Sequence, residues 1–396
     1  MKPEGALQTL RRAVVPLLLL AALVAIILRM GPADTVRGDN YPPVEVLSFQ
    51  RVVLTPEGIT ATILNDGPDP VTIAQVAVDD AFWAFQADAG TTLDHLQRTR
   101  LTIPYPWVHG ETHVVKLMTA TGMTFEHEIA VAVETPSPSA RMAGIFVLIG
   151  LYVGVIPVAI GLLWYPLMSV LGRRGLDFVL ALTIGLLLFL FADSLQEGFE
   201  SALALPASYQ GLALLVLGAV GAYLSLDALG AWLKTRRAKA ADGRSSGWVL
   251  ALLMAIGIGL HNFAEGLAIG AAFALGEAAL GTLLIIGFML HNATEGLAIV
   301  APLGSDRVRF RDLVWLGLIG GAPTIGGALL GGLFYSPVLS VLFLAMGAGA
   351  IAQVLAQIAR QVAGQRPVEQ FLATAPALAG LLAGFSVMYA TGMIVG

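Results

Sequence analysis

The sequence predicts a polytopic α-helical membrane protein, with an eight-helix bundle preceded by one membrane anchor helix and a small all-β extracytoplasmic domain. The chain of 396 residues is 57% hydrophobic and only 12% charged, whereas soluble domains are about 45–50% apolar and about 25% charged. Apolar stretches of about 20 residues, long enough to cross the hydrocarbon core, recur toward the C-terminus. This composition excludes an ordinary soluble enzyme, and the net charge of -5 offers no basic surface for nucleic acid.

The first element is an apolar run over 13–28, within a segment assigned to 1–30. It follows Arg11 and Arg12, a basic-then-apolar order shared by secretory signal peptides and membrane anchors. Arg29 directly after the run, and only a poor cleavage candidate at 31–33, favour a retained anchor over a cleaved signal peptide.

Residues 31–140 form the second predicted unit, an immunoglobulin-like β-sandwich outside the membrane. Short alternating runs such as 71–78 are separated by turn sequences such as 65–70, and 120–124 reads as the turn of a hairpin. The length of roughly 110 residues suits such a sandwich. The segment contains fourteen Asp or Glu against five Lys or Arg, so we expect it to concentrate cations outside the membrane.

Residues 141–396 contain eight apolar runs, which we expect to cross the membrane as helices. They fall near 142–171, 178–198, 209–233, 248–274, 278–303, 313–334, 338–360 and 371–396. Among the connections between runs, every second one is basic, at 173–174, 234–244, 307–311 and 360–366, and the others contain no Arg or Lys, which makes the basic connections cytoplasmic by the positive-inside rule. The sequence therefore predicts a multi-pass plasma-membrane protein with residues 31–140 and the C-terminus extracytoplasmic.

Two similar motifs occupy the fourth and fifth runs. His-Asn-Phe-Ala-Glu-Gly-Leu-Ala-Ile-Gly begins at His261 and His-Asn-Ala-Thr-Glu-Gly-Leu-Ala-Ile-Val at His291, and seven of the ten positions are identical. His and Glu four residues apart share one helical face and supply nitrogen and oxygen ligands to metals. Ionisable residues inside a span are costly, so these are candidates for function. The chain has no cysteine, which excludes a thiolate site. The predicted metal ligands are His261, Asn262, Glu265, His291, Asn292 and Glu295.

The spacing of the motifs predicts how they meet. His261 and His291 are each fifteen residues from Gly276 in the connection, so in an antiparallel hairpin they lie at the same depth. Four residues of rise, about 6 Å, then place Glu265 toward the outside and Glu295 toward the cytoplasm. We expect a ladder of ligands along the membrane normal. The alternative is that these polar groups only hold the helices together by hydrogen bonds.

On these motifs, residues 142–396 resemble the Zrt/Irt-like (ZIP) metal transporters, and especially the GufA-like bacterial and archaeal branch. The resemblance rests on two His-Asn-x-x-Glu-Gly sequences thirty residues apart, on the fourth and fifth of eight helices. It implies a homodimer that imports zinc and related divalent metals, including iron, manganese, cobalt and cadmium, with the six motif residues as the transport site. It also implies that Asp193 and Glu197, four apart on the second run, act as entrance ligands; the alternative is that they lie on a solvated helix rim.

Two further hypotheses remain open at this level. A membrane-embedded zinc hydrolase could use the same ligands, although it needs an open water position and a separate general base. The outer domain could capture metal through its four histidines, His95, His109, His113 and His127, or these could belong to solvated strands. The transporter hypothesis implies no enzymatic activity, no cofactor and a divalent cation, zinc first, as the transported substrate.

Overall fold

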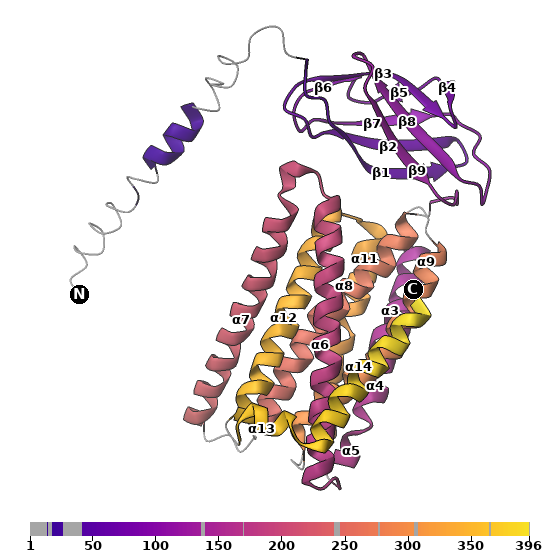
Figure 1. The fold of residues 1–396 in the computed structure, drawn as a ribbon. Helices are drawn as coiled ribbons and strands as arrows, with labels where there is room; N and C mark the ends of the chain where they lie inside the picture. Colours follow the sequence, from indigo (N-terminus) through magenta and orange to yellow (C-terminus); the bar gives the residue numbers. More distant parts are fainter. Residues whose placement is uncertain are drawn as a thin grey trace.

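The computed structural model describes residues 14, 18–26, 42–135, 139–168, 170–240, 246–275, 278–304, 308–363 and 366–395. A small β-domain sits at one end of a long helical bundle (Figure 1). Of the predicted anchor, Val14 and residues 18–26 are helical, and the remainder lies outside the described residues.

The β-domain consists of two antiparallel sheets. The first has the order β1-β2-β7-β5, and the second has the order β4-β3-β8-β9 with β6 paired to β3. The strands are β1 Leu47–Thr55, β2 Gly58–Asn65, β3 Val71–Val78, β4 Ala81–Trp83, β5 Gln86–Ala87, β6 Thr92–Leu93, β7 Arg98–Ile103, β8 His113–Thr119 and β9 Thr124–Ile129. The edge strands β1 and β9 lie on the side that faces the helices (Figure 1).

Alternating apolar residues of both sheets share one core. Ile63 of β2, Val76 of β3, Leu101 of β7 and Leu117 of β8 are almost completely buried in it. This two-sheet packing buries one face of each sheet, as strict apolar alternation requires. The predicted hairpin is confirmed, because β8 and β9 pair antiparallel across the turn at 120–123. The immunoglobulin-like topology stays a prediction.

The helical part contains eight helices that are long and apolar enough to cross a membrane, counted over the described residues, as the sequence predicts. Their bounds are Ala140–Met168, Arg173–Ala204, Ala207–Arg236, Gly247–Ala274, Leu280–Leu303, Phe310–Leu333, Pro337–Ala363 and Ala375–Met393. The third includes the short helix η2 (Ala207–Tyr209) that precedes α7, and the fifth ends in η3 (Ala301–Leu303). The short helix α13 (Val368–Leu372) lies before the last long one, α14 (Ala375–Val395).

Two of these eight helices are interrupted near their middles. The first runs as α3 (Ala140–Gly150), the π-helical turn η1 (Leu151–Val155), α4 (Ile156–Leu162) and α5 (Tyr165–Met168). The sixth is divided into α10 (Phe310–Gly321) and α11 (Pro323–Leu333). Pro157 and Pro323 stand at the starts of α4 and α11, where the missing N–H breaks the regular hydrogen-bond ladder.

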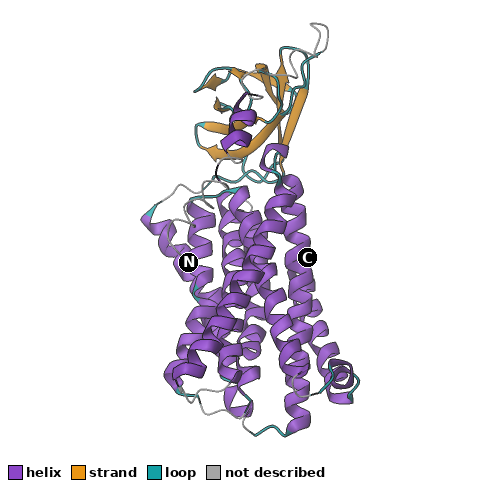
Figure 2. Cartoon of the chain, turned by 90° about the vertical axis from the view of Figure 1, so that its left-hand side faces the viewer, coloured by secondary structure: helices purple, strands orange, loops and turns teal. Residues whose placement is uncertain are grey.

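The β-domain is held on the bundle through the connection between α6 (Arg173–Ala204) and α7 (Gly211–Ala240). The carboxylate of Asp66 accepts hydrogen bonds from the backbone N–H groups of Ala207 at 2.7 Å and Ser208 at 3.2 Å. Arg98 of β7 donates to the hydroxyl of Tyr209. A second view shows the domain standing over the helix ends (Figure 2). The β-domain therefore covers one end of the bundle.

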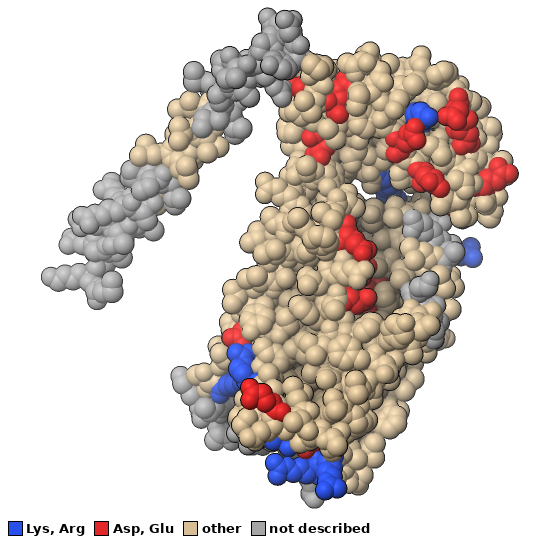
Figure 3. All heavy atoms as spheres, in the orientation of Figure 1, with Lys and Arg blue, Asp and Glu red and all other residues tan. Residues whose placement is uncertain are grey.

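Basic residues are concentrated at one end of the bundle. On the face shown in Figure 3, Lys and Arg gather at the end of the bundle remote from the β-domain, whereas Asp and Glu are scattered over the β-domain. Arg366 at the remote end pairs with Asp177 at 2.5 Å, and Arg360 pairs with Asp227 at 2.6 Å. The basic connections thus share one end of the bundle.

Candidate metal centre

The two sequence motifs lie side by side near the middle of two packed helices. His261, Asn262 and Glu265 belong to α8 (Ser246–Ala274), and the equivalent residues of the second motif belong to α9 (Ala278–Val300). His261 is fifteen residues from the first residue of α8 and thirteen from the last, or about 20 Å from either end at 1.5 Å per residue. All six motif residues are buried, none more than 8% exposed. They are therefore remote from both ends of the bundle.

Four of these side chains form one compact cluster. One ligand atom from each of His261, Glu265, His291 and Glu295 lies within 4.8 Å of all the others. The four ligand atoms of one tetrahedral ion lie about 3.4 Å apart at metal–ligand distances of about 2.0–2.2 Å. A contraction of the cluster by rotation of these side chains would therefore allow all four atoms to bind one ion.

The cluster is more compact than the ladder expected from the sequence. Glu265 Oε1 contacts His261 Nε2 at 3.0 Å and also contacts His291 Nε2, so it lies at the level of both imidazoles. The reason is that helical side chains lean toward the N-terminus of their own helix. In antiparallel helices this draws Glu265 and Glu295 back toward the level of the histidines, from opposite sides. The expected separation along the bundle axis is thereby largely cancelled.

Four side-chain oxygens of the motif residues are buried and have no hydrogen-bond partner within the described structure. These are both carboxylate oxygens of Glu295 and the side-chain carbonyl oxygens of Asn262 and Asn292. Buried polar atoms are nearly always paired, so orphaned acceptors call for an explanation such as a bound ion. Carboxylate and amide oxygens together with imidazole nitrogens are ligands for divalent first-row metals. The donor set therefore suits such a cation.

The two asparagines are oriented by the two interrupted helices. Asn262 Nδ2 donates to the carbonyl of Gly320 at 3.0 Å, and Asn292 Nδ2 donates to the carbonyl of Val153 at 3.0 Å. Pro157, four residues after Val153, has no N–H to offer that carbonyl. Each side-chain amide nitrogen thus donates to a backbone carbonyl next to a helix interruption. Asn292 also donates to Glu265 Oε2 at 3.1 Å, and Asn262 lies next to Glu295.

Close packing of glycines brings the broken helices to the motif helices. A Cβ on Gly161 of α4 would lie 2.1 Å from the carbonyl oxygen of Ala293, and one on Gly296 of α9 would lie 2.2 Å from that of Val158. A Cβ on Gly327 of α11 would lie 2.0 Å from the carbonyl oxygen of Phe263 in α8. Only glycine permits these backbone contacts, which is the usual use of small residues in apolar bundles.

Ser194, which is not among the predicted site residues, also contacts the cluster. Ser194 of α6 is 1% exposed, and its hydroxyl lies 3.0 Å from His261 Nδ1. Asp193 and Glu197, predicted at an entrance, are exposed on α6 and are not part of the four-residue cluster. The polar run from 193 to 197 is the sequence feature that could have pointed to Ser194. Pro157 and Pro323, which lie within apolar runs, indicate where the first and sixth helices are interrupted.

The histidines of the β-domain do not converge on a common site. His113 donates from Nδ1 to Asp79 at 2.7 Å, and its Nε2 accepts from the backbone N–H of Val108 at 3.2 Å. The same carboxylate accepts from Tyr105 at 2.6 Å, and this hydrogen bond raises the pKa of the Tyr105 hydroxyl to about 12. His95 Nδ1 contacts the carbonyl of Gly67 at 2.7 Å. Among the described residues, the one group of His, Asp and Glu arranged to hold a metal is the cluster in the bundle.

Comparison with known proteins adds no relative to this picture. No protein-family model matches the chain, and no curated protein is significantly similar to it.

Proposed function

We propose that the chain is an integral membrane protein that transports divalent metal cations, zinc first among them, through the cluster formed by His261, Glu265, His291 and Glu295. The proposal includes the expected sidedness, with the β-domain outside the plasma membrane and transport directed into the cytoplasm. It also includes membership of the ZIP family, which the two motifs resemble, and the homodimer that this resemblance implies.

The observation that carries the proposal is a buried set of two imidazoles and two carboxylates in the middle of two apolar helices. Burying two carboxylates is costly unless a cation compensates them. Hydrogen bonds between helices do not require such a set, because Asn or Ser would hold the helices at lower cost. A divalent ion balances the two carboxylate charges, and the orphaned oxygens of Asn262, Asn292 and Glu295 offer further ligands.

The arrangement fits transport better than catalysis for a reason of symmetry. Both motifs supply one histidine and one glutamate, and both asparagines are held by an interrupted helix in the same manner. A catalytic zinc site differs between its two sides, since one side must keep a water position with a general base beside it. A site that takes the same types of ligand from both helices suits an ion that enters from one side of the membrane and leaves on the other.

The test is uptake of radioactive zinc into proteoliposomes that contain the purified full chain. We expect uptake by the wild type and background uptake by His261→Ala and by His291→Ala. His109→Ala, an exposed change in the outer domain, is the matched control and should retain wild-type uptake. Zinc binding without uptake by the wild type would overturn the transport proposal and favour the hydrolase alternative.

A further inference from the structure

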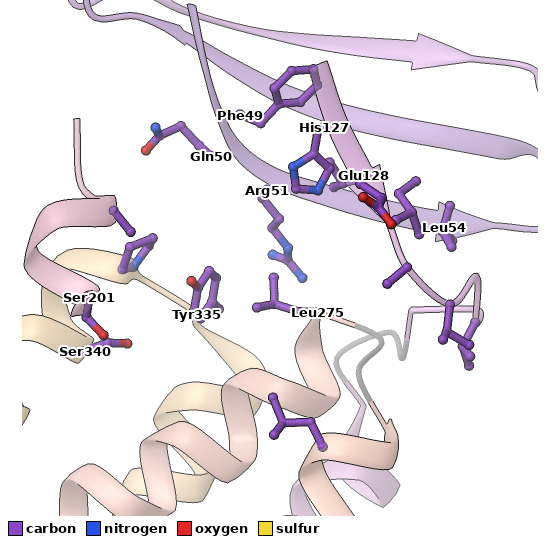
Figure 4. A pocket seen from close by; sticks show the side chains of 18 residues that line it. Phe49, Gln50, Arg51, Leu54, His127, Glu128, Ser201, Leu275, Tyr335 and Ser340 are labelled. Carbon is purple, nitrogen blue, oxygen red and sulfur yellow. The ribbon is translucent and has the colours of Figure 1, made fainter. Parts of the chain in front are cut away.

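A second cavity, separate from the metal cluster, lies between the β-domain and the helix ends. It has a volume of about 700 Å³, which is within the range of small-molecule sites. Its roof is formed by the edge strands β1 and β9, and its floor by the ends of α6, α8, α9 and α12 (Pro337–Ala363) (Figure 4). No motif residue lines it.

A β-bulge directs one cation into this cavity. The pairing of β1 with β2 shifts between Phe49 and Arg51, so that Phe49 pairs with Ile63 and Arg51 with the next residue, Thr62. Without the bulge, Arg51 would follow the alternation of Leu47 and Phe49 and face the apolar core of the domain. Bulges commonly redirect side chains in this way. Arg51 instead extends from β1 toward the helix ends, near Tyr335 and Leu275 (Figure 4).

The guanidinium of Arg51 has no partner in the described structure. Its Nε is buried without a hydrogen bond, and no Asp or Glu of the described residues forms an ion pair with Arg51. Among the described residues that line the cavity, Arg51 is the single Lys or Arg, and Glu128, exposed on the opposite edge strand, is the single Asp or Glu. A half-buried guanidinium without a counter-ion is costly, and its planar fork matches a carboxylate or a phosphate.

The remaining walls are mainly apolar, with a few groups that can donate hydrogen bonds. The apolar wall residues are Val52, Leu54, Ile129, Val131, Val133, Leu275 and Leu280. Ser201 and Ser340 add hydroxyls at the helix ends, and His127 stacks on Phe49 with ring centroids 5.1 Å apart. Such walls accommodate an alkyl chain, and a cavity of this kind binds chiefly apolar ligands that are oriented by few polar groups.

We propose that this cavity binds an amphipathic anion, an alkyl chain bearing a carboxylate or a phosphate, with the acidic group paired to Arg51. The anion supplies the missing counter-charge, and the chain removes the apolar walls from water. A divalent metal is the wrong ligand here, since the cavity presents a cation to it. The inference does not depend on metal transport, because it uses no residue of the metal cluster.

Binding to the purified full chain tests this inference. The protein is kept in a nonionic sterol-based detergent without alkyl chains and titrated with laurate, dodecyl phosphate, dodecanol and inorganic phosphate. We expect both amphipathic anions to bind at least tenfold more tightly than dodecanol or inorganic phosphate. Native mass spectrometry of the protein as purified then distinguishes a retained phospholipid from a retained free fatty acid.

The variants separate charge from folding. Arg51→Gln should weaken binding of laurate and dodecyl phosphate at least tenfold and leave dodecanol binding unchanged, while Arg51→Lys should recover part of the loss. Arg100→Gln, an exposed arginine of the same domain outside the cavity, should bind like the wild type. Ser340→Trp should obstruct the cavity without altering its charge. Wild-type laurate affinity in Arg51→Gln, or equal affinity for inorganic and dodecyl phosphate, would overturn the inference.

Discussion

Glu265 and Glu295 occupy the same position in two copies of one motif, yet their carboxylates have opposite surroundings. Glu265 Oε1 contacts the Nε2 atoms of His261 and His291. Neither oxygen of Glu295 has a hydrogen-bond partner in the described structure. The two glutamates should therefore contribute differently to the stability of the metal-free protein, although both should contribute to metal binding.

Replacement of each glutamate by Gln separates these contributions. We expect Glu265→Gln and Glu295→Gln each to weaken zinc binding tenfold or more, because either change removes half of the negative charge that faces the ion. Without metal, Glu265→Gln should lower the free energy of unfolding by about 1–3 kcal/mol, because two imidazoles lose a charged acceptor. Glu295→Gln should leave it unchanged or raise it, since an unpaired buried carboxylate is removed.

Zinc titrations and thermal unfolding of the two variants in detergent provide the measurement. Glu111→Gln, an exposed change in the outer domain, is the control for both readings. Equal destabilisation of the metal-free protein by the two cluster variants would show that the asymmetry between Glu265 and Glu295 has no energetic consequence.

Close contact between α4 and α9 should be required for the geometry of the cluster. Gly161→Ala places a methyl group 2.1 Å from a backbone oxygen of α9, so the helices must separate. We expect a loss of about 1–3 kcal/mol in stability, typical of overpacking, together with weaker zinc binding. Gly144→Ala in α3 meets no atom within 4 Å and should leave both unchanged. If Gly161→Ala behaves like Gly144→Ala in thermal unfolding and zinc titration, the contact is not needed.

The β-domain should lose local stability as the pH falls through the ordinary range of histidine. Burial lowers the pKa of His127, whereas in the unfolded chain it should be near 6.5. Between these two values the unfolded state binds more protons, so the stabilisation is present above about pH 6.5 and is lost as the pH falls toward the folded pKa. Hydrogen exchange of β9 in the full chain, corrected for intrinsic rates, should be faster at pH 5.5 than at pH 7.5. The difference in exchange rate between the two pH values should be smaller in His127→Gln. An equal difference in both proteins would contradict the assignment of the pH dependence to His127.

The sidedness of the chain can be tested with single cysteines, because the natural sequence contains none. Ala120→Cys lies on the β-domain and Arg236→Cys lies near the end of α7 remote from that domain, and both positions are exposed. We expect a membrane-impermeant thiol reagent to label Ala120→Cys in intact cells and Arg236→Cys only after permeabilisation. The reverse pattern would place the β-domain in the cytoplasm.

Most of the fold can be predicted from the sequence, because local patterns determine the helices and strands. Eight long apolar runs and one alternating segment each determine their own secondary structure, and the hairpin between β8 and β9 followed from a short turn sequence. The equal spacing of His261 and His291 from their connection indicated that they would meet. The predicted separation of Glu265 from the histidines is wrong. The rise per residue gives the position of the backbone, but helical side chains lean toward the N-terminus of their helix.

Other features depend on contacts between distant segments and could not be read from one motif. The carbonyls of Val153 and Gly320 hold the asparagines only because two interrupted helices pack on α8 and α9. Ser194 contacts His261 because of the way α6 packs in the bundle, whereas the sequence pattern predicts Asp193 and Glu197 as the entrance ligands of this helix. The cavity at Arg51 requires both a bulge in β1 and the docking of the domain on the bundle.

The most direct test of the central claim is anomalous diffraction at the zinc edge from crystals of the full chain grown with zinc. The account predicts one strong peak per chain in the bundle, about 2.0–2.2 Å from side-chain atoms of His261, Glu265, His291 and Glu295. One ion is expected because the cluster holds two carboxylates, and repulsion between two divalent ions about 4 Å apart would be strong. An empty cluster with zinc bound elsewhere, or two fully occupied zinc ions in it, would contradict the account.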